Sequence, residues 1–473
     1  MNIRLAVLAA VLVPAPLLAQ RAAGPDSAGR AARPLALVGA TLVNPGSEPV
    51  PDAVVVAVDG KIACAGTRAA CPVPRGARTV PVAGEWIIPG LVDAHVHFSQ
   101  TGWVDGRPDA LDLRARYPYD SVVAFLERHP ERYFRAYVCS GITAVFDVGG
   151  YPWTWGLRAR AENDVLAPHV AAAGPLLSTV DHWINLPFSK QILWVTNDSV
   201  ARADVRAHAY QGTDAIKIWY IVTPGADTAA LKAVVRSIAD ETHRRHLRLI
   251  VHATDLWEAK DALRAGADVL VHGVFDKPVD DEFIALALAN HVVYIPTITV
   301  VDGYRQARVR HFEPHYPLTC VDTATLARAR SADSLPPPPA GSVTADFVAR
   351  QQALVAHEFD IGRANLLAVY RAGITVAAGT DAGNPLTLHG PSLLWELEVM
   401  QQAGLTPAQV LATATRNGAL AMGRSDLGVV AQGMDADLVV LGSDPLTDIA
   451  NVQDVRYVMR AGALTTPQRA APR

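Results

Sequence analysis

Two histidines in the run Asp93-Ala94-His95-Val96-His97 are the most distinctive candidates for chemistry in this chain of 473 residues. They follow an apolar run at residues 86–92, which predicts a buried β-strand. Residues i and i+2 of a strand point to the same face, so His95 and His97 project together. Two neutral imidazoles at a strand end can hold a cation such as zinc. A chance pair is the alternative, because the H-x-H spacing is common.

Four further polar residues stand where other predicted strands end. Enzymes built on parallel barrels recruit catalytic groups from the carboxyl ends of several strands at once. A single histidine after a strand is usually a structural residue, but six polar groups at strand ends favour a metal site. The four residues are Lys217, His252, His272 and Asp381.

The strands that must position these groups alternate with helical patterns through the middle of the chain. Most are rich in Val, Ile and Ala without alternation, which is typical of parallel strands buried on both faces. Helical patterns at residues 228–246 and 256–265 separate some of them. Eight such strands predict an α/β fold, the (β/α)8 TIM barrel. They cover residues 87–94, 143–148, 170–173, 215–218, 249–251, 269–271, 293–295 and 376–378.

Short strands near both ends of the chain predict a second, smaller domain that is β-sandwich-like. Asp59-Gly60, between two of these strands, is a strong hairpin signal. We assign residues 34–88 and 425–465 to this domain, and residues 89–424 to the barrel. A long insertion at about residues 302–345, which contains Pro336–Pro339, would lie over or beside the mouth of the active site. The predicted strands cover residues 35–43, 53–58, 61–65, 437–441 and 455–460.

The first 20 residues predict a signal peptide. Arg4 precedes an apolar run at residues 5–19, which is short for a membrane span, and Pro14 and Pro16 would break a helix there. A polar linker at residues 21–33 follows, which disfavours the alternative of a buried N-terminal helix. No later segment has 18 uninterrupted apolar residues, so we expect no membrane span. Because of the signal peptide, we expect a periplasmic or secreted protein.

Composition and cysteine usage argue against a disordered protein, a nucleic-acid-binding protein and a thiolate zinc site. Half of the residues are hydrophobic and 19% are charged, which is typical of a globular protein. The net charge is −4 and no basic run occurs, so nucleic acid is not the expected partner. The four cysteines form no C-x-x-C pair, which argues against a thiolate zinc site. In an exported protein Cys64 and Cys71 could form a disulfide across a short loop, and two unpaired thiols are the alternative.

Taken in order, the motifs of the chain resemble those of the amidohydrolase superfamily. Within it they resemble the imidazolonepropionase-like branch, which includes prolidase-type dipeptidases and N-acyl amino acid amidases. The resemblance covers nearly the whole chain after the predicted linker. It rests on Ile88-Pro89-Gly90-Leu91-Val92-Asp93-Ala94-His95-Val96-His97, Gly379-Thr380-Asp381-Ala382-Gly383, His389-Gly390, Ala412-Thr413-Ala414-Thr415 and Gly433-Met434-Asp435-Ala436-Asp437-Leu438.

The resemblance implies two divalent metal ions, with zinc as the expected metal, bridged by an N6-carboxylated Lys217. An unmodified ammonium would repel the metals, whereas the carbamate is an anionic oxygen ligand. A lysine that extends from a strand end toward solvent is the alternative. By similarity, one group of residues serves the more buried metal, a second the more exposed metal, and Lys217 bridges. The groups are His95, His97 and Asp381, and His252 and His272.

This site predicts metal-dependent hydrolysis. A water held between two divalent metals has its pKa lowered from about 16 toward about 7, which gives a metal-bridging hydroxide. Asp381 would act as the general base and pass the proton to the leaving amine. We expect cleavage of an amide or peptide bond in a dipeptide or an N-acyl amino acid. A lactonase or organophosphate-type esterase could use the same site, and a catalytically silent scaffold is a third reading that the intact ligand set disfavours.

Substrate contacts are expected from the loops that follow the strands. By resemblance, His182 and Tyr220 contact the substrate carbonyl or carboxylate; Trp153 and His389 are further candidates. The surrounding residues, Thr179-Val180-Asp181-His182 and Trp219-Tyr220-Ile221-Val222, depart from the Gly-Gly-His and Ser-Gly-Gly of close relatives, so dipeptide specificity does not transfer directly.

The chemical character of the substrate has weaker signals. Tryptophans in these loops suggest an apolar or aromatic acyl group, with ordinary packing as the alternative. Arg158 or Arg305 could bind a substrate carboxylate, although either could equally be a surface arginine. The expected partner is a small molecule, and a homo-oligomer remains open because many relatives form symmetric assemblies.

Overall fold

Parallel β-strands in two sheets form the centre of the protein, seen in a computed structural model that describes residues 33–332, 335 and 343–472. The predicted signal peptide and Pro336–Pro339 lie outside the described residues. One sheet has the order β6-β7-β8 and the other β10-β9-β11-β12-β13-β14-β15. This arrangement confirms the predicted α/β class with parallel sheets. The strands are β6 (Leu91–Val96), β7 (Ile142–Asp147), β8 (His169–Ala172), β9 (Leu176–Ser178), β10 (Ile192–Trp194), β11 (Ala215–Trp219), β12 (Arg248–His252), β13 (Val269–Val271), β14 (Val293–Ile295) and β15 (Thr375–Val376).

The two parallel sheets meet at both of their edges. At one edge the chain passes from β8 directly to β9 across Ala173, Gly174 and Pro175. At the other edge the amide of Ala94, in β6, donates to the carbonyl of Ala378, just beyond β15, over 3.0 Å. Val96 and Ala382 form a further parallel bridge there. Contacts of this kind are what a closed ring of strands requires.

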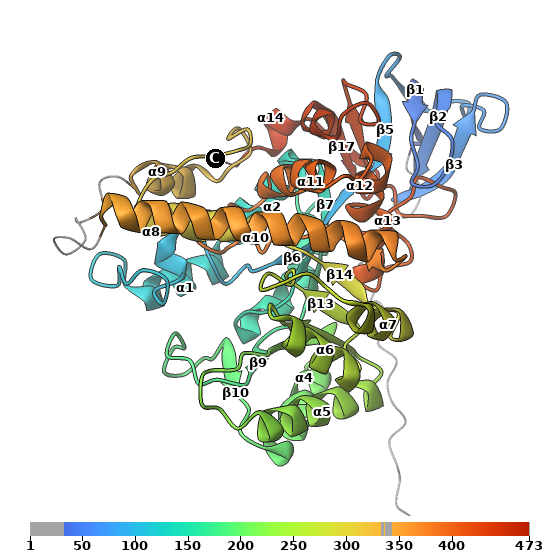
Figure 1. Cartoon of the computed structure of the whole chain (residues 1–473). Coiled ribbons are helices and arrows are strands. Elements are labelled where there is room, and N and C mark those ends of the chain that lie inside the picture. Colours follow the sequence, from blue (N-terminus) through green and yellow to red (C-terminus); the bar gives the residue numbers. More distant parts are fainter. Residues whose placement is uncertain (1–32, 333–334, 336–342, 473) are drawn as a thin grey trace, which may run out of the picture. The chain divides into compact units, whose positions relative to one another are not determined.

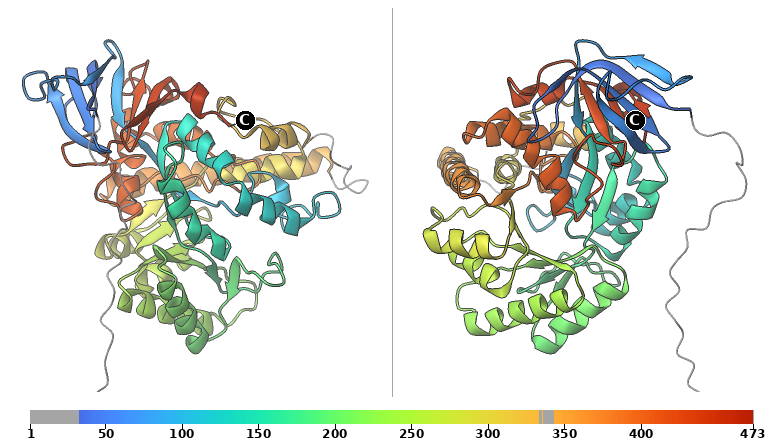
Figure 2. Two further views of the ribbon diagram at one scale, coloured as in Figure 1. Left: turned by 180° about the vertical axis from the view of Figure 1, so that it is seen from behind. Right: turned by 90° about the vertical axis from the view of Figure 1, so that its right-hand side faces the viewer.

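Helices follow most of the strands; Figure 1 shows α6 and α7 beside β13 and β14, and in the right-hand view of Figure 2 the green helices lie outside the strands. Several begin at a side chain that accepts a backbone amide, as Asp227 does for α5 and Asp280 for α7. Within the described chain, no helix has both the length and the apolar character needed to cross a bilayer. The helices are α1 (Tyr119–Arg128), α2 (Glu131–Cys139), α3 (Leu157–Glu162), α4 (Asp198–Tyr210), α5 (Thr228–Arg244), α6 (Leu256–Ala265), α7 (Asp281–Ala289), α8 (Val300–Val309), α9 (Thr323–Arg330), α10 (Ala345–Arg371), α11 (Ser392–Gln402), α12 (Pro407–Thr413), α13 (Arg416–Ala421) and α14 (Pro467–Ala470).

Strands from both ends of the chain share a third sheet, which we call the mixed sheet. Its strand order is β18-β17-β16-β5-β1-β2-β3, and β4 pairs with β1. The early and late strands lie side by side in Figure 1, drawn in blue and red. Among the described residues the two ends form this one sheet, and the second layer of a sandwich is not seen. Its strands are β1 (Leu35–Leu42), β2 (Val50–Val58), β3 (Lys61–Thr67), β4 (Arg78–Pro81), β5 (Trp86–Pro89), β16 (Leu438–Leu441), β17 (Val455–Arg460) and β18 (Ala463–Thr465).

The single strand predicted at residues 87–94 is two strands in the structure. Its first half is β5, which pairs with β1 and β16 in the mixed sheet, and its second half belongs to β6. Gly90 separates them at a point of close approach, where a Cβ atom would lie only 2.0 Å from the hydroxyl of Thr143. The apolar run therefore contributes strands to two sheets. Gly90 has no side chain, which allows the close approach to Thr143 at the point between them.

An ionic cluster around the buried His169 connects the mixed sheet to β8. His169 Nδ1 lies 2.6 Å from Glu162 Oε1 and its Nε2 lies 3.0 Å from Asp437 Oδ2. Arg460 Nη2 contacts the second oxygen of Glu162 at 3.1 Å. Burial lowers the pKa of His169, but its hydrogen bonds to Asp437 and Glu162 outweigh this, so the pKa is raised above the usual 6.5. The cluster therefore favours the protonated form of His169.

We expect His169→Gln to lower the Tm most at acidic to neutral pH. A histidine whose pKa is raised on folding contributes stability that is complete below 6.5 and disappears as the pH rises through the folded value. The expected loss is about 2–4 °C at pH 6, and it should shrink toward pH 9. Thermal unfolding of both proteins across this range measures it. An equal loss at every pH would contradict the charged role of His169.

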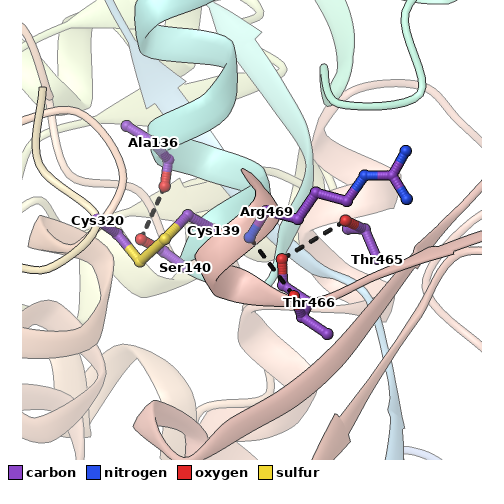
Figure 3. The surroundings of a disulfide bond; sticks show 7 residues. All are labelled: Ala136, Cys139, Ser140, Cys320, Thr465, Thr466 and Arg469. Carbon is purple, nitrogen blue, oxygen red and sulfur yellow. Dashed lines mark hydrogen bonds between the residues drawn. A yellow bond between two sulfur atoms is a disulfide. The ribbon is translucent and has the colours of Figure 1, made fainter. Parts of the chain in front are cut away.

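Two disulfides join the four cysteines. Cys64 pairs with Cys71, as hypothesised, and Cys139 pairs with Cys320 across 181 residues of sequence. The second bond ties the segment between α8 and α9, within the predicted insertion, to the end of α2. Figure 3 shows it beside Thr466 and Arg469 of the C-terminal helix region. No cysteine is free.

Alkylation should therefore leave all four cysteines unmodified in the oxidised, denatured protein. After reduction we expect four adducts per chain, because each thiol then becomes reactive. Intact mass with and without reductant measures this. Two adducts without reductant would show that one of the two pairs is absent from the protein.

Candidate metal centre

Three side chains from two strand ends converge on one point. Asp381 Oδ1 lies 2.9 Å from His97 Nε2 and 3.2 Å from His95 Nε2. The two ring nitrogens are 3.3 Å apart. His95 and His97 come from the end of β6, and Asp381 follows β15 at the neighbouring edge of the parallel sheets. The alternation of side chains along β6 brings the two rings to one face, as the sequence predicts.

The other three predicted ligands lie around the same point. His272, just after β13, has its ring centroid 4.9 Å from that of His95 and 4.4 Å from that of His252, at the end of β12. Its Nδ1 is 4.0 Å from Asp381 Oδ2. Lys217, in β11, is buried and lines one cavity together with His252, His272 and Asp381. The structure thus brings all six predicted residues together: five lie at or just beyond the carboxyl ends of their strands, and Lys217 lies in the middle of β11.

Burial controls the charge of this centre. It lowers the pKa of His95 to about 3 and the pKa values of His252 and His272 well below 6.5, so these rings are neutral and keep a lone pair for a metal. Burial also lowers the pKa of Lys217 to about 7. Near neutral pH part of the lysine is therefore an uncharged amine, which is the form that can react with carbon dioxide.

Asp381 keeps its charge in spite of its burial. Burial acts to raise its pKa, but the adjacent His95 and His97 outweigh that effect and hold the pKa well below 3.8. The carboxylate is therefore ionised. Its backbone has a φ of 62°, and that of His272 has a φ of 72°, in the left-handed region that such residues rarely adopt. Strain of this kind, about 1–3 kcal/mol per residue, is typical of functional sites.

Neighbouring groups fix the orientation of the ligands. His97 Nδ1 lies 2.6 Å from the carbonyl oxygen of Gly149, and His272 Nδ1 lies 2.8 Å from Thr297 Oγ1. In each ring this leaves Nε2 for a metal. Asp93 Oδ1 accepts the amides of His95 and Thr380, and its Oδ2 accepts the Thr380 hydroxyl at 2.6 Å. Asp93 thereby holds the end of β6 against the loop that carries Asp381.

The residues present fit a divalent metal. The Asp381 oxygen that faces the two histidines is buried and accepts no hydrogen bond from the described residues. Ligand atoms of His95, His97 and Asp381 all lie within 4.8 Å of one another. Imidazole nitrogens and a carboxylate oxygen that converge in this way are the ligand types that zinc takes in proteins.

A cavity of about 480 Å³ opens beside the candidate metal centre. Its walls come from the strand ends and from the segments after β14, since Tyr304 of α8 and Glu358 of α10 also line it. Leu176, Ile184, Phe275 and Val300 give it an apolar part. A cavity of this size and mixed lining suits a small organic molecule.

The four residues predicted to contact substrate do not line this cavity. Tyr220 is fully buried and its hydroxyl donates to Asp261 over 2.9 Å. His389 is buried between the Tyr137 hydroxyl and the carbonyl of Gln100. These two side chains already have protein partners, which explains why they do not face the cavity.

His182 and Trp153 are also off the cavity wall. The His182 ring centroid lies 5.2 Å from that of Trp219, which does line the cavity, so His182 is next to a residue of the cavity wall. Trp153 packs against the hydrophobic core. The cavity wall instead includes Gln100, Arg107 and Asn384, which the sequence analysis missed because they stand in loops with no periodic pattern. Asp93 carried a signal, since it opens the motif that contains both histidines.

Comparisons with known proteins agree with this picture. The sequence model of the Amidohydrolase family matches residues 86–465. An uncharacterised protein of Mycobacterium tuberculosis is 25% identical over 381 residues, which cover 78% of this chain and 84% of that protein. The ochratoxinase of Aspergillus niger is 24% identical over 470 residues, covering 90% of this chain and 86% of the relative.

Solved structures extend the similarity to the fold. The crystal structure of an Xaa-Pro dipeptidase with bound methionine in its active site superposes with a TM-score of 0.68 at 21% identity. The superposition covers 92% of this chain and all of the dipeptidase chain. Both parallel sheets and the mixed sheet thus belong to an architecture that occurs in solved enzymes.

Proposed function

The chain belongs to the amidohydrolase family, whose members are hydrolases, and on that premise we propose that it cleaves an amide or peptide bond in a small molecule at a centre of two divalent metals. The single observation that carries the proposal is the convergence of six ligand-type side chains from five strands beside one cavity. Zinc is the proposed metal, a carboxylated Lys217 the proposed bridge, and a closed (β/α)8 barrel the proposed frame.

In this proposal the ligands divide between the two metals. His95, His97 and Asp381 would hold one ion, His252 and His272 would hold the other, and Lys217 as a carbamate would add an anionic oxygen ligand. When bound, the metals supply Lewis-acid polarisation of a water and of the scissile carbonyl. The low pKa values of the buried histidines support this assignment because a neutral imidazole is the ligand form.

Asp381 is the residue that we propose moves the proton. Its ionised carboxylate lines the cavity and can accept the proton of the attacking water. It can then deliver that proton to the nitrogen of the leaving group, so that the amine departs neutral. The apolar part of the cavity, with Leu176 and Phe275, limits the access of bulk water to the reacting bond.

We further propose that the protein is exported. Two disulfides persist in an oxidising compartment, which agrees with the predicted signal peptide. The similarity to an ochratoxinase and to an Xaa-Pro dipeptidase supports a small organic substrate.

A substrate panel tests the proposed reaction. Zinc-loaded protein should hydrolyse at least one member among dipeptides and N-acyl amino acids, and the Asp381→Asn variant should not. If only lactones or phosphotriesters are hydrolysed, the bond that the protein cleaves is an ester, and the proposed amide cleavage is wrong. Absence of all turnover in protein that holds two metals would contradict a hydrolytic function.

A further inference from the structure

Arg107 is a buried cation on the wall of the cavity, and the proposed reaction does not use it. Its relative exposure is 9%, and it lies in the loop between β6 and α1. Nε and Nη2 donate to the two carboxylate oxygens of Asp109 over 2.8 and 2.7 Å, and Nη1 donates to Asn384. The ring of Tyr304 lies 5.7 Å from the guanidinium carbon. Such a bidentate pair with an aromatic neighbour fixes a guanidinium in one orientation.

This orientation leaves part of the guanidinium for a ligand. Of its five N–H groups, three donate to Asp109 and Asn384, and the Tyr304 hydroxyl also interacts with it. At least one N–H therefore remains. Asn384 connects this group to the centre, because its amide nitrogen donates to the carbonyl of Asp381 over 3.0 Å. Arg107 thus stands close to the proposed reacting bond.

Gln100 is a second, independent sign of a ligand on this wall. Its side chain is 7% exposed and lines the cavity, yet its Oε1 has no hydrogen-bond partner among the described residues. An amide oxygen is an acceptor, and a buried acceptor without a partner is unfavourable, so Gln100 Oε1 is expected to accept an N–H of a bound molecule. Gln100 comes three residues after His97, which places it beside the metal ligands.

The remaining charged groups of the cavity restrict where an anion can bind. Asp255, Asp276 and Glu358 line other parts of the wall. Like charges repel, so a carboxylate of the substrate is disfavoured against those residues. Arg305, which the sequence offered as a carboxylate ligand, pairs with Asp302 and does not line the cavity. Arg158 likewise contacts Gly212 and Asp214 away from it.

We propose that Arg107 binds a carboxylate of the substrate next to Asp381, and that Gln100 Oε1 accepts the N–H of the substrate amide. The inference rests on the proposed function and narrows it. The preferred substrate is an amide whose leaving group carries a carboxylate, such as an N-acyl amino acid or a dipeptide. The carboxylate in such molecules stands one carbon from the amide nitrogen, and Arg107 is close enough to Asp381 for their charges to interact.

The test compares a carboxylate with its neutral carboxamide. N-benzoyl-L-phenylalanine and N-benzoyl-L-phenylalaninamide are titrated into zinc-loaded Asp381→Asn protein, so that neither is consumed, and calorimetry measures the Kd. We expect the acid to bind at least about tenfold more tightly than the amide. Adding Arg107→Gln should remove this preference, lowering affinity for the acid about tenfold while that for the amide changes less than about threefold. Gln100→Leu should weaken the acid and the amide by similar factors, because both probes carry the N–H that Gln100 Oε1 would accept.

Two further variants keep this test decisive. Arg107→Gln leaves Asp109 without its partner, so the double variant with Asp109→Asn removes both charges and should show the same loss of preference at an unchanged Tm. Arg305→Gln, a paired arginine off the cavity, should keep the preference. Equal binding of acid and amide, equal weakening of both by Arg107→Gln, or no binding of either overturns the inference. The proposed function is tested separately, by the panel of hydrolysis substrates.

Discussion

Replacing Asp381 with asparagine is expected to abolish hydrolysis while the protein keeps its metal. Asparagine retains an oxygen in place of Oδ1, which faces His95 and His97, but it cannot accept a proton from the attacking water. General-base catalysis contributes about 10²–10⁴-fold, so kcat should fall by at least that factor. Metal analysis beside steady-state kinetics measures both quantities on the same sample.

A matched control separates this effect from the loss of any buried carboxylate. Asp261 is as buried as Asp381, but it lies off the cavity and accepts the hydroxyl of Tyr220. Asp261→Asn keeps an acceptor there and should retain most of the activity. Near-normal kcat in Asp381→Asn would show that another group takes the proton.

Replacing Lys217 with alanine should remove metal and activity together. Nζ is the one proposed ligand that becomes anionic only through carboxylation, so its loss takes away the bridge between the metals. We expect metal content to fall below two ions per chain and kcat to fall by at least about 10²-fold, the usual effect of losing a metal-orienting group. Elemental analysis after dialysis measures the metal.

A chemical test distinguishes the carbamate from an ordinary lysine. If Lys217 acts as a carboxylate-bearing ligand, acetate or propionate should restore part of the metal binding and activity of Lys217→Ala. The same acids should not affect Lys190→Ala, in which an exposed lysine is removed. Full metal content and activity in Lys217→Ala would contradict the bridging role.

The candidate metal ligands could be placed from the sequence because each stands in or just after a buried strand, near its carboxyl end or, for Lys217, in its middle. Parallel strands bring their carboxyl ends to one edge, and this rule alone brings Lys217, His252 and His272 into one place. The alternation along β6 orients His95 and His97 in the same way. Local chain geometry and one topological rule are therefore sufficient for this part of the site.

Contacts that depend on distant segments could not be predicted in this way. Arg107 faces the cavity because Asp109 and Asn384 hold it, and Asn384 is 277 residues away in sequence. Cys139 and Cys320 are brought together by the packing of α2 against the insertion, for which the sequence carries no periodic signal. Tyr220 and His389 have the right residue types for substrate contact, but buried partners already occupy their polar atoms.

The mixed sheet imposes an order on the maturation of the chain. β5 lies between β1 and β16, and β16 begins only at Leu438. A ribosome therefore completes most of the polypeptide while one edge of β5 has no partner strand. An unpaired edge is a template for association with other chains. Newly made protein that pauses or is truncated before β16 should consequently be prone to aggregation, and shielding of β5 until synthesis ends would be a requirement for good yield.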